Sequence, residues 1–303
     1  MRFLTPSAIF LLLLSPLAGQ VALGDNIANF GLGKVRGYKQ SGPGSEDVAA
    51  SSYGFNVFAT TTTGGTINAA KVYGPLTGYL GVKGPQDLGI NDNGAGLAVT
   101  GYLDQGSLDT DFPQDNSGNY RLRIDVGAIN QNFPNDYDFE IPFNLGASAY
   151  VSDVPRLTID NGAWHDATYV VSATDTGTNF GWVFSDFDAQ NPEDYVTLFR
   201  ISPMQGGLDV VNVQLGPNQS GYTVAAGVLQ AGTDYTVTLH FARIVDLPAV
   251  QGLNATGAAF YAVETSLALQ AVPEPSTYAL LGTGLAAVLI WSWRRRAAAK
   301  PRR

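Results

Sequence analysis

The chain has 303 residues, a formal net charge of −9 at pH 7 and no cysteine. The lack of cysteine excludes a disulfide framework and any thiol chemistry. The acidic balance argues against nucleic acid or anionic lipid as a partner, because both require a positive potential on the protein.

The first 24 residues have the features of a secretory signal peptide. Arg2 opens a short basic region, and the apolar stretch Ala8–Leu14 follows it. The small residues of Ala22-Leu23-Gly24 suit a cleavage site, so the mature chain is expected to begin at Asp25 after export.

Residues 25–271, which we call the passenger, contain 10 Lys and Arg against 25 Asp and Glu, a net charge near −15. Short runs of alternating hydrophobicity are separated by Asn, Asp, Gly and Pro, and no interior segment has sustained helical periodicity. These features predict an all-β fold, an antiparallel Greek-key-like β-sandwich. Strands are expected at residues 53–60, 120–126, 169–173, 180–187, 195–201, 210–215, 235–244 and 258–269.

The passenger is expected to consist of a β-rich region at residues 25–152 and a sandwich at residues 153–271. Its first part is interrupted by polar segments, Ser41–Asp47 and Asp104–Asn119, that read as loops. The Gly- and Ser-containing stretch Asn144–Pro155 is the expected junction. Whether the two parts are one domain or two is left open.

A local pattern in the second part sharpens the fold prediction. In Leu229–Leu239 a leucine and a Gly-Thr turn precede Tyr235, which opens an alternating strand. This spacing matches a tyrosine corner, with the ring of Tyr235 in the core and its hydroxyl bonded backward to the backbone. Val237, Leu239 and Phe241 would also point inward, and Trp182 would be buried on an earlier strand. Residues 154–270 thus resemble a fibronectin type III or immunoglobulin-like sandwich.

Catalytic motifs are weak, so no enzyme activity and no resident cofactor are expected. His240 lies between Leu239 and Phe241, so alternation should point it outward, and His165 is read as a turn residue. Gly146–Tyr150 departs from the G-x-S-x-G elbow at its last position. Gly31-Leu32-Gly33 lacks the flanking strand and helix of a dinucleotide-binding loop.

Carboxylate side chains are abundant in the passenger, and two kinds of site could use them. Asp109, Asp111 and Asp115 lie in the expected loop and, with nearby carbonyls, are a possible calcium site, since calcium takes six to eight oxygen ligands. A glycosidase needs two carboxylates across a cleft. Its candidates are Asp186, Asp188, Glu193 and Asp194.

The last residues form a tripartite tail. It begins with Val272, Pro273, Glu274, Pro275, Ser276 and Thr277, whose two prolines keep the segment extended and exposed. The apolar run Tyr278–Trp293 follows; as a helix it would span roughly 24 Å and is expected to cross the membrane. The basic segment 294–303, beginning with Arg294, Arg295 and Arg296, would stay in the cytoplasm as a stop-transfer signal.

This tail resembles the PEP-CTERM sorting signal of Gram-negative bacteria. Pro273, Glu274 and Pro275 match its P-E-P triplet, Gly282 and Gly284 its glycine-containing helix, and Arg294–Arg296 its basic end. The resemblance implies recognition by an exosortase, a membrane processing enzyme, and association with envelope, exopolysaccharide and biofilm matrix. It also implies inner-membrane anchoring before the protein reaches the cell surface or matrix. An ordinary tail anchor is the alternative.

Three function classes follow for the passenger. The first is a non-catalytic surface or matrix protein displayed through the tail. The second is a carbohydrate-binding module, with Tyr73, Tyr79 and Tyr102 as a stacking platform. The third is a polysaccharide-active enzyme that uses paired carboxylates.

Overall fold

The fold comes from a computed structural model of the chain. It describes residues 26–76, 84–92, 94–126, 132–147, 150, 154–173, 177–183, 195–216, 219–250, 252–253, 255–273, 285 and 288–290. The predicted signal peptide at residues 1–24 lies outside these residues.

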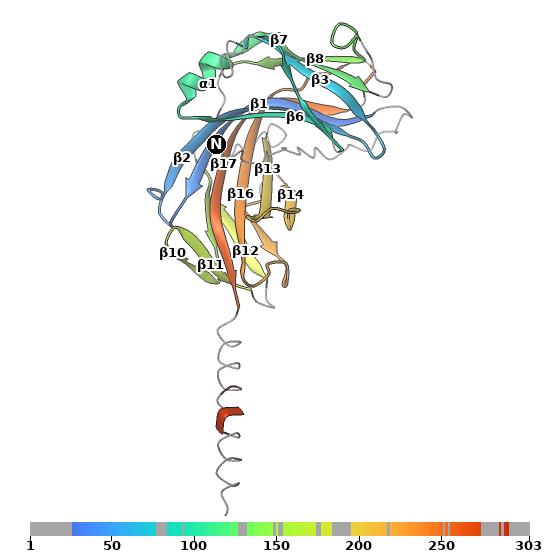
Figure 1. The fold of residues 1–303 in the computed structure, drawn as a ribbon. Coiled ribbons are helices and arrows are strands. Elements are labelled where there is room, and N and C mark those ends of the chain that lie inside the picture. The colour runs from blue at the N-terminus through green and yellow to red at the C-terminus, as the bar shows by residue number, and fades with distance from the viewer. Residues whose placement is uncertain are drawn as a thin grey trace, which may run out of the picture.

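A long, twisted sheet of ten strands forms the frame of the molecule (Figure 1). Its main path runs β14-β13-β16-β17-β1-β2-β6-β5, and the β10–β11 hairpin joins through β11 at the end of β17. The strands are β1 (Ile27–Gln40), β2 (Val48–Thr61), β5 (Gly89–Asn91), β6 (Gly94–Tyr102), β10 (Gly162–His165), β11 (Thr168–Ser172), β13 (Tyr195–Pro203), β14 (Val211–Leu215), β16 (Thr233–Asp246) and β17 (Thr256–Val272).

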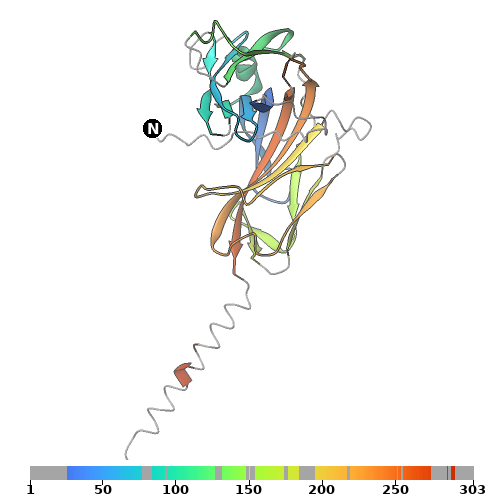
Figure 2. The same ribbon diagram turned by 90° about the vertical axis from the view of Figure 1, so that its right-hand side faces the viewer.

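Two smaller sheets pack on the long sheet near its opposite ends (Figures 1 and 2). One is a four-stranded sheet in the order β4-β3-β7-β8, and the other is a three-stranded sheet in the order β15-β12-β9. Their strands are β3 (Ile67–Tyr73), β4 (Gln86–Asp87), β7 (Asp115–Val126), β8 (Phe139–Leu145), β9 (Arg156–Ile159), β12 (Thr178–Val183) and β15 (Gly221–Val224). The helix α1 (Gln105–Asp111) follows β6.

A hydrophobic core lies under each of the two smaller sheets, and the strand β17 contributes side chains to both. Ala259 and Tyr261 belong to the core under the four-stranded sheet. Leu267, Leu269 and Ala271 belong to the core under the three-stranded sheet. Because side chains alternate along a strand, these odd-numbered residues share one face. One face of one strand therefore links the two halves of the molecule.

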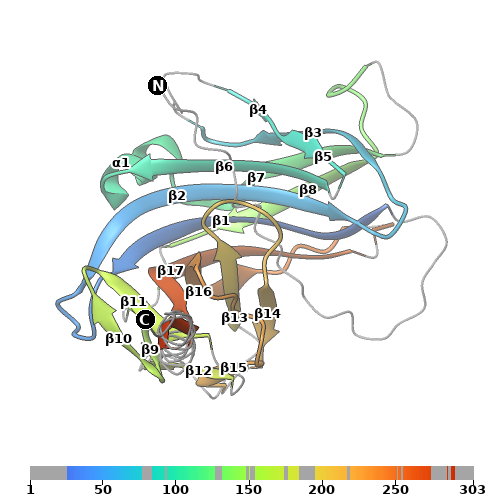
Figure 3. The ribbon, with the colours of Figure 1, turned by 60° about the horizontal axis from the view of Figure 1, so that its bottom comes forward.

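The two halves of the passenger share the long sheet. Four strands from the first half, β1, β2, β5 and β6, lie in it beside strands of the second half (Figure 3). The last strand of the first half, β8, ends at Leu145, and the first strand of the second half, β9, begins at Arg156. Gln40, fully buried at the end of β1, also crosses this boundary: its amide bonds both the N–H (2.9 Å) and the carbonyl (2.8 Å) of Leu157.

The all-β prediction is confirmed, but the sheet is not purely antiparallel. The strand β17 pairs in parallel with β1 along its first part and with β11 along its last part. Parallel neighbours need a long crossover. The two parallel partners, β1 and β11, are distant from β17 in sequence. Pairing between distant strands leaves no signal in the local alternation of hydrophobic residues. The prediction of a wholly antiparallel sandwich was wrong at this strand.

The tyrosine corner is present in β16. The ring of Tyr235 is buried (1% exposed), and its hydroxyl accepts a hydrogen bond from the backbone N–H of Gln230 at 2.8 Å. Val237, Leu239 and Phe241 are buried as predicted. Trp182 is buried on β12, where its ring stacks on Phe199 and its Nε1 donates to the Gln219 carbonyl at 3.0 Å.

Removing the corner hydroxyl should weaken the fold modestly. Tyr235→Phe is expected to lower the free energy of unfolding by about 1 kcal/mol, because the Gln230 N–H loses its partner while the ring packing stays. Urea unfolding of the purified passenger measures this loss. Tyr222→Phe is the matched control, since Tyr222 packs on the same core beside Phe199, and its effect should stay within about 0.5 kcal/mol. Equal losses in both variants would contradict the corner's role.

Two sequence expectations need correction. Asp104–Asn119 is not one loop: Asp104 caps α1 through a 2.8 Å bond from the Ser107 N–H, and β7 begins at Asp115. The helix α1 has only 7 residues, and Leu108 is its one buried residue. A helix this short shows no hydrophobic periodicity in the sequence. His240 does not point outward, because it is only 2% exposed. It lies on the opposite face of β16 from Tyr235, and that face is also covered there.

Candidate functional site

The tail leaves the folded body directly from the end of β17. Val272 pairs with Ser172 of β11, and its carbonyl accepts from the Ala173 N–H at 2.8 Å. The preceding residue, Ala271, is fully buried and accepts from the Gly232 N–H at 2.7 Å. Pro273 has no N–H to donate, so it cannot extend the ladder in the same way. The P-E-P triplet therefore starts at the first residue after the sheet.

Only part of the remaining tail is described. Glu274–Thr277 and Arg294–Arg296 of the predicted motif lie outside the described residues. Leu285 and the three residues from Val288 to Ile290 are helical, and these four side chains are 57–63% exposed. In the described part of the chain, no helix has the length and apolar character to cross a membrane.

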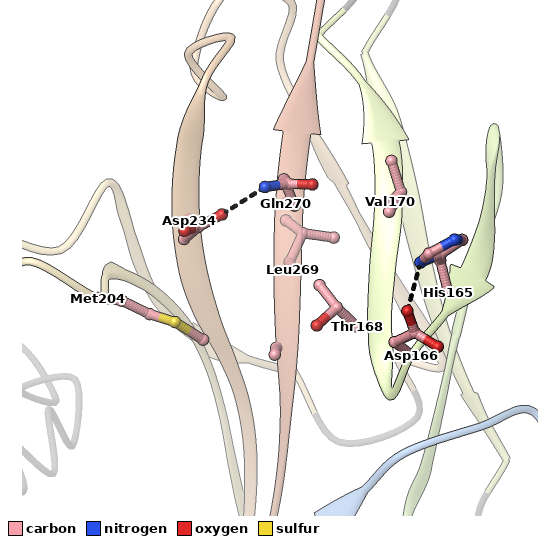
Figure 4. Close-up of a pocket in the computed structure, with 9 residues that line it drawn as sticks. His165, Asp166, Thr168, Val170, Met204, Asp234, Leu269 and Gln270 are labelled. Atoms are coloured by element: carbon pink, nitrogen blue, oxygen red, sulfur yellow. Dashed lines mark hydrogen bonds and ion pairs between the residues drawn. The ribbon is translucent and has the colours of Figure 1, made fainter.

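A surface hollow of about 260 Å³ lies beside the tail exit (Figure 4). The last part of β17 supplies its floor through Ala268 and Gln270, and Gln270 donates to Asp234 of β16 at 3.0 Å. The turn of the β10–β11 hairpin forms one wall, and Met204, after β13, forms the other. The lining residues are His165, Asp166, Thr168, Val170, Met204, Asp234, Ala268, Leu269 and Gln270. Sequence reasoning missed this site because its residues come from four separate segments.

The predicted calcium ligands have separate protein partners. Asp109 pairs with Lys34, and Asp111 accepts a 2.6 Å hydrogen bond from the Tyr102 hydroxyl. Asp115 accepts from the backbone N–H of Asn119 at 2.8 Å. Among the described residues, no three His, Cys, Asp or Glu side chains form a group suited to a metal ion. The calcium site stays a prediction.

Lys34 is a second feature that sequence reasoning missed. Its side chain is 0% exposed, it lies on the face of β1 that carries Phe30 and Leu32, and its ammonium meets Asp109 of α1. Burial lowers the pKa of Lys34, and the contact with Asp109 opposes that shift. Gln105 donates to the other oxygen of Asp109 at 3.1 Å. The pair therefore fastens α1 to the long sheet.

Arg36 extends this polar network toward the middle of the molecule. It donates to the Gln105 side-chain oxygen, and its guanidinium lies 4.0 Å from the centre of the Tyr150 ring. Tyr150 in turn packs edge-on against Tyr261, whose hydroxyl donates to the Gly146 carbonyl at 2.7 Å. Burial raises the pKa of both tyrosines. The alternation Phe30, Leu32, Lys34, Arg36 is the sequence signal that could have placed these cations inside.

Of the aromatic residues proposed for carbohydrate stacking, Tyr73 and Tyr102 lie on different sheets. Tyr73 lies on β3 of the four-stranded sheet, with the Arg123 guanidinium 4.5 Å from its ring centre. Tyr102 lies on β6 of the long sheet, where its ring contacts Phe112 edge-on. Tyr79 is outside the described residues, as are the four carboxylates considered for a glycosidase, Asp186, Asp188, Glu193 and Asp194.

The two histidines lie in different environments. His165 is 78% exposed at the β10–β11 turn, and its Nδ1 is 3.2 Å from the Asp166 carboxylate. The Nδ1 of His240 is 3.7 Å from the Glu264 carboxylate. Burial lowers the pKa of His240; Glu264 opposes this shift, and Arg200 adds to it. The pKa of Glu264 is also lowered, by its contacts with His240 and Arg200, against the effect of burial.

Acid should therefore destabilise the passenger through His240. The unfolded chain takes up a proton near pH 6.5, whereas the folded chain takes it up only at lower pH, so stability falls as the pH drops below 6.5. The slope from this group can reach at most about 1.4 kcal/mol per pH unit, the value for one proton. Urea unfolding at several pH values measures it. His240→Gln should flatten the slope and His165→Gln should keep it; an unchanged slope in His240→Gln would contradict this assignment.

Comparison with known proteins identifies the tail. Residues 271–296 match the family model of the PEP-CTERM protein-sorting motif. The match begins at Ala271, the last inward-facing residue of β17, and ends at Arg296. The chain therefore carries a PEP-CTERM sorting motif, and the prediction drawn from the P-E-P triplet, the apolar run and the arginine cluster is confirmed.

The comparisons say less about the passenger. No curated protein matches the chain. Among solved structures, it is similar to the FN1–FN3 domains of chicken CNTN1, at 12% sequence identity and a TM-score of 0.23. That similarity covers 82% of this chain and 67% of the other. A TM-score this low does not assign a fold, so the fibronectin type III or immunoglobulin-like assignment stays a prediction.

Proposed function

We propose that the protein is an exported, non-catalytic component of the bacterial cell envelope or extracellular matrix. Its passenger is presented or released by an exosortase-type membrane enzyme that processes the tail at Val272–Thr277. The observation that carries this proposal is the sorting-motif match at residues 271–296, which begins where β17 ends. In this proposal the protein is held in the inner membrane before processing and then reaches the surface or matrix, where it associates with exopolysaccharide.

The geometry of the exit supports processing at this point. Residues up to Val272 are held by hydrogen bonds to β11, and the triplet begins at the next residue. Prolines at 273 and 275 disfavour both helix and ladder formation, so the segment is available as an extended strand. A processing enzyme can bind such a strand without unfolding the passenger.

The non-catalytic part of the proposal rests on the weak catalytic motifs of the sequence, and the two histidines of the passenger lie apart. His165 and Asp166 are exposed at a hairpin turn, while His240 is buried beside Glu264 on the long sheet. These two sites lie in different places, and neither combines a nucleophile with a general base. The net charge of the passenger, near −15, suits solubility and a neutral or cationic partner in the matrix.

Replacing the triplet tests this proposal. In cells of the native host, the variant Pro273→Ala/Glu274→Ala/Pro275→Ala should still be exported but should accumulate unprocessed in the inner membrane. The measurement is cell fractionation with mass spectrometry of the mature C-terminus. A control that removes a glutamate and a proline elsewhere, Glu46→Ala with Pro248→Ala, should be processed normally. Arg294–Arg303 retained in wild type and triple variant alike, with the same distribution, would reduce the tail to an ordinary anchor.

A further inference from the structure

The hollow beside the tail exit and the sorting motif belong to one strand. Gln270 forms part of the hollow's floor, and Pro273 follows it by three residues. At about 3.3 Å per residue, the hollow and the start of the triplet are roughly 10 Å apart along the chain. Figure 4 shows Leu269 and Gln270 on β17, between the Met204 side and the His165 hairpin.

This distance brings the hollow within reach of any enzyme that binds the triplet. A stable protein–protein interface covers about 800 Å² on each partner. Even fully extended, five residues such as 273–277 can span only about 17 Å. Since Pro273 directly follows the end of β17, an enzyme that binds the triplet would lie close to the passenger around the exit. The hollow lies within that zone.

The lining of the hollow suits one kind of side chain. Asp166 and Asp234 contribute carboxylates from opposite sides, and none of the described residues that line the hollow is a Lys or an Arg. The Asp166 side chain is 92% exposed, so an incoming group can reach it. Val170, Met204 and Ala268 add apolar surface to the lining. A long cationic side chain combines an aliphatic stem with a charged head, and it matches both features.

We propose that this hollow is a docking surface that receives an arginine or lysine of the membrane enzyme that processes the tail. The inference rests on the proposed function and extends it, because it makes the folded passenger part of what the enzyme recognises. The folded passenger then influences how fast the enzyme processes the tail. Recognition by the triplet alone would leave the rate independent of the hollow.

Charge reversal at the two acids tests the docking surface. In the full-length chain, Asp166→Lys and Asp234→Lys should each slow conversion of precursor to product at least tenfold in pulse-labelled cells. Asp92→Lys changes the charge equally at an exposed turn in the other half of the molecule and should convert at the wild-type rate. Urea unfolding of each purified variant checks the fold. Asp166→Lys keeps the test valid if Asp234→Lys does not fold, because Asp166 is exposed at a turn.

A spacer inserted between the passenger and the triplet is the second test of the docking surface. Six Gly and Ser residues inserted between Val272 and Pro273 move the triplet up to about 20 Å further from the hollow. The insertion alone should slow processing as strongly as Asp234→Lys, and the combination should be no slower than the insertion. Normal processing of Asp166→Lys and Asp234→Lys, beside a blocked triple alanine variant, would overturn the docking surface and leave the proposed function standing. Normal processing of the triple alanine variant would instead remove the proposed function itself.

Discussion

Asp109→Ala is expected to lower the free energy of unfolding by about 3 kcal/mol, because it leaves the Lys34 ammonium inside the protein without its carboxylate partner. This loss of stability lies at the lower end of the range for broken buried ion pairs, because the Asp109 side chain is 28% exposed and water reaches part of the pair. Urea unfolding at pH 7 measures the loss.

A double replacement separates the charge from the packing. Lys34→Met with Asp109→Leu removes both ionic groups and keeps apolar volume, so the double variant should recover most of the stability lost in Asp109→Ala. If the double variant is as unstable as Asp109→Ala, the pair is not the source of the loss. The result would then point to the packing of α1.

Gly33→Ala is the second substitution with a large expected effect, also about 3 kcal/mol. A Cβ on Gly33 would lie 2.4 Å from the carbonyl oxygen of Phe260, in the neighbouring strand β17. That oxygen belongs to the backbone of the central pair of strands, so β1 and β17 would have to separate. The measurement is again urea unfolding, with thermal unfolding as a second readout.

Gly216→Ala is the matched control for this prediction. A Cβ on Gly216 meets nothing within 4 Å, and the residue does not have a positive φ. Its replacement should be neutral or stabilise the protein by up to about 1 kcal/mol. Similar losses in Gly33→Ala and Gly216→Ala would show that backbone freedom, rather than close packing, determines the effect.

The same close packing explains why sequence reasoning did not find β1. Alternation located strands wherever branched and aromatic residues dominate, as at Tyr235–Ile244 and Ala258–Leu269. In β1 the alternate positions Gly31 and Gly33 are glycines, because Phe58 and Phe260 lie against them on one face of the sheet. A strand with glycine at alternate positions resembles a loop in the sequence. Its partners, far away in sequence, determine its structure.

The two errors about single side chains also have long-range causes. Alternation correctly assigned His240 to the opposite face from Tyr235, but solvent exposure of that face was an assumption. On that face His240 is flanked by Leu198, its partner on β13, and by Phe260 on β17, whose ring centre is 6.4 Å from the imidazole centre. Lys34 was overlooked because a lysine is read as exposed unless a partner is known, and Asp109 is distant in sequence. The tail was predictable because its three parts are contiguous and need no tertiary partner.

The direct junction of β17 and the tail also determines how the protein responds to force. A protein held by its C-terminus and dragged by flow is pulled along β17, which is bonded to β16 on one side and to β1 and β11 on the other. Load along the strand shears these ladders, so many hydrogen bonds share it and must yield together. A tether at a hairpin turn would instead peel bonds apart one by one. Forced unfolding depends on the unfolding rate, so pulling from the tail should place this fold among the mechanically resistant ones.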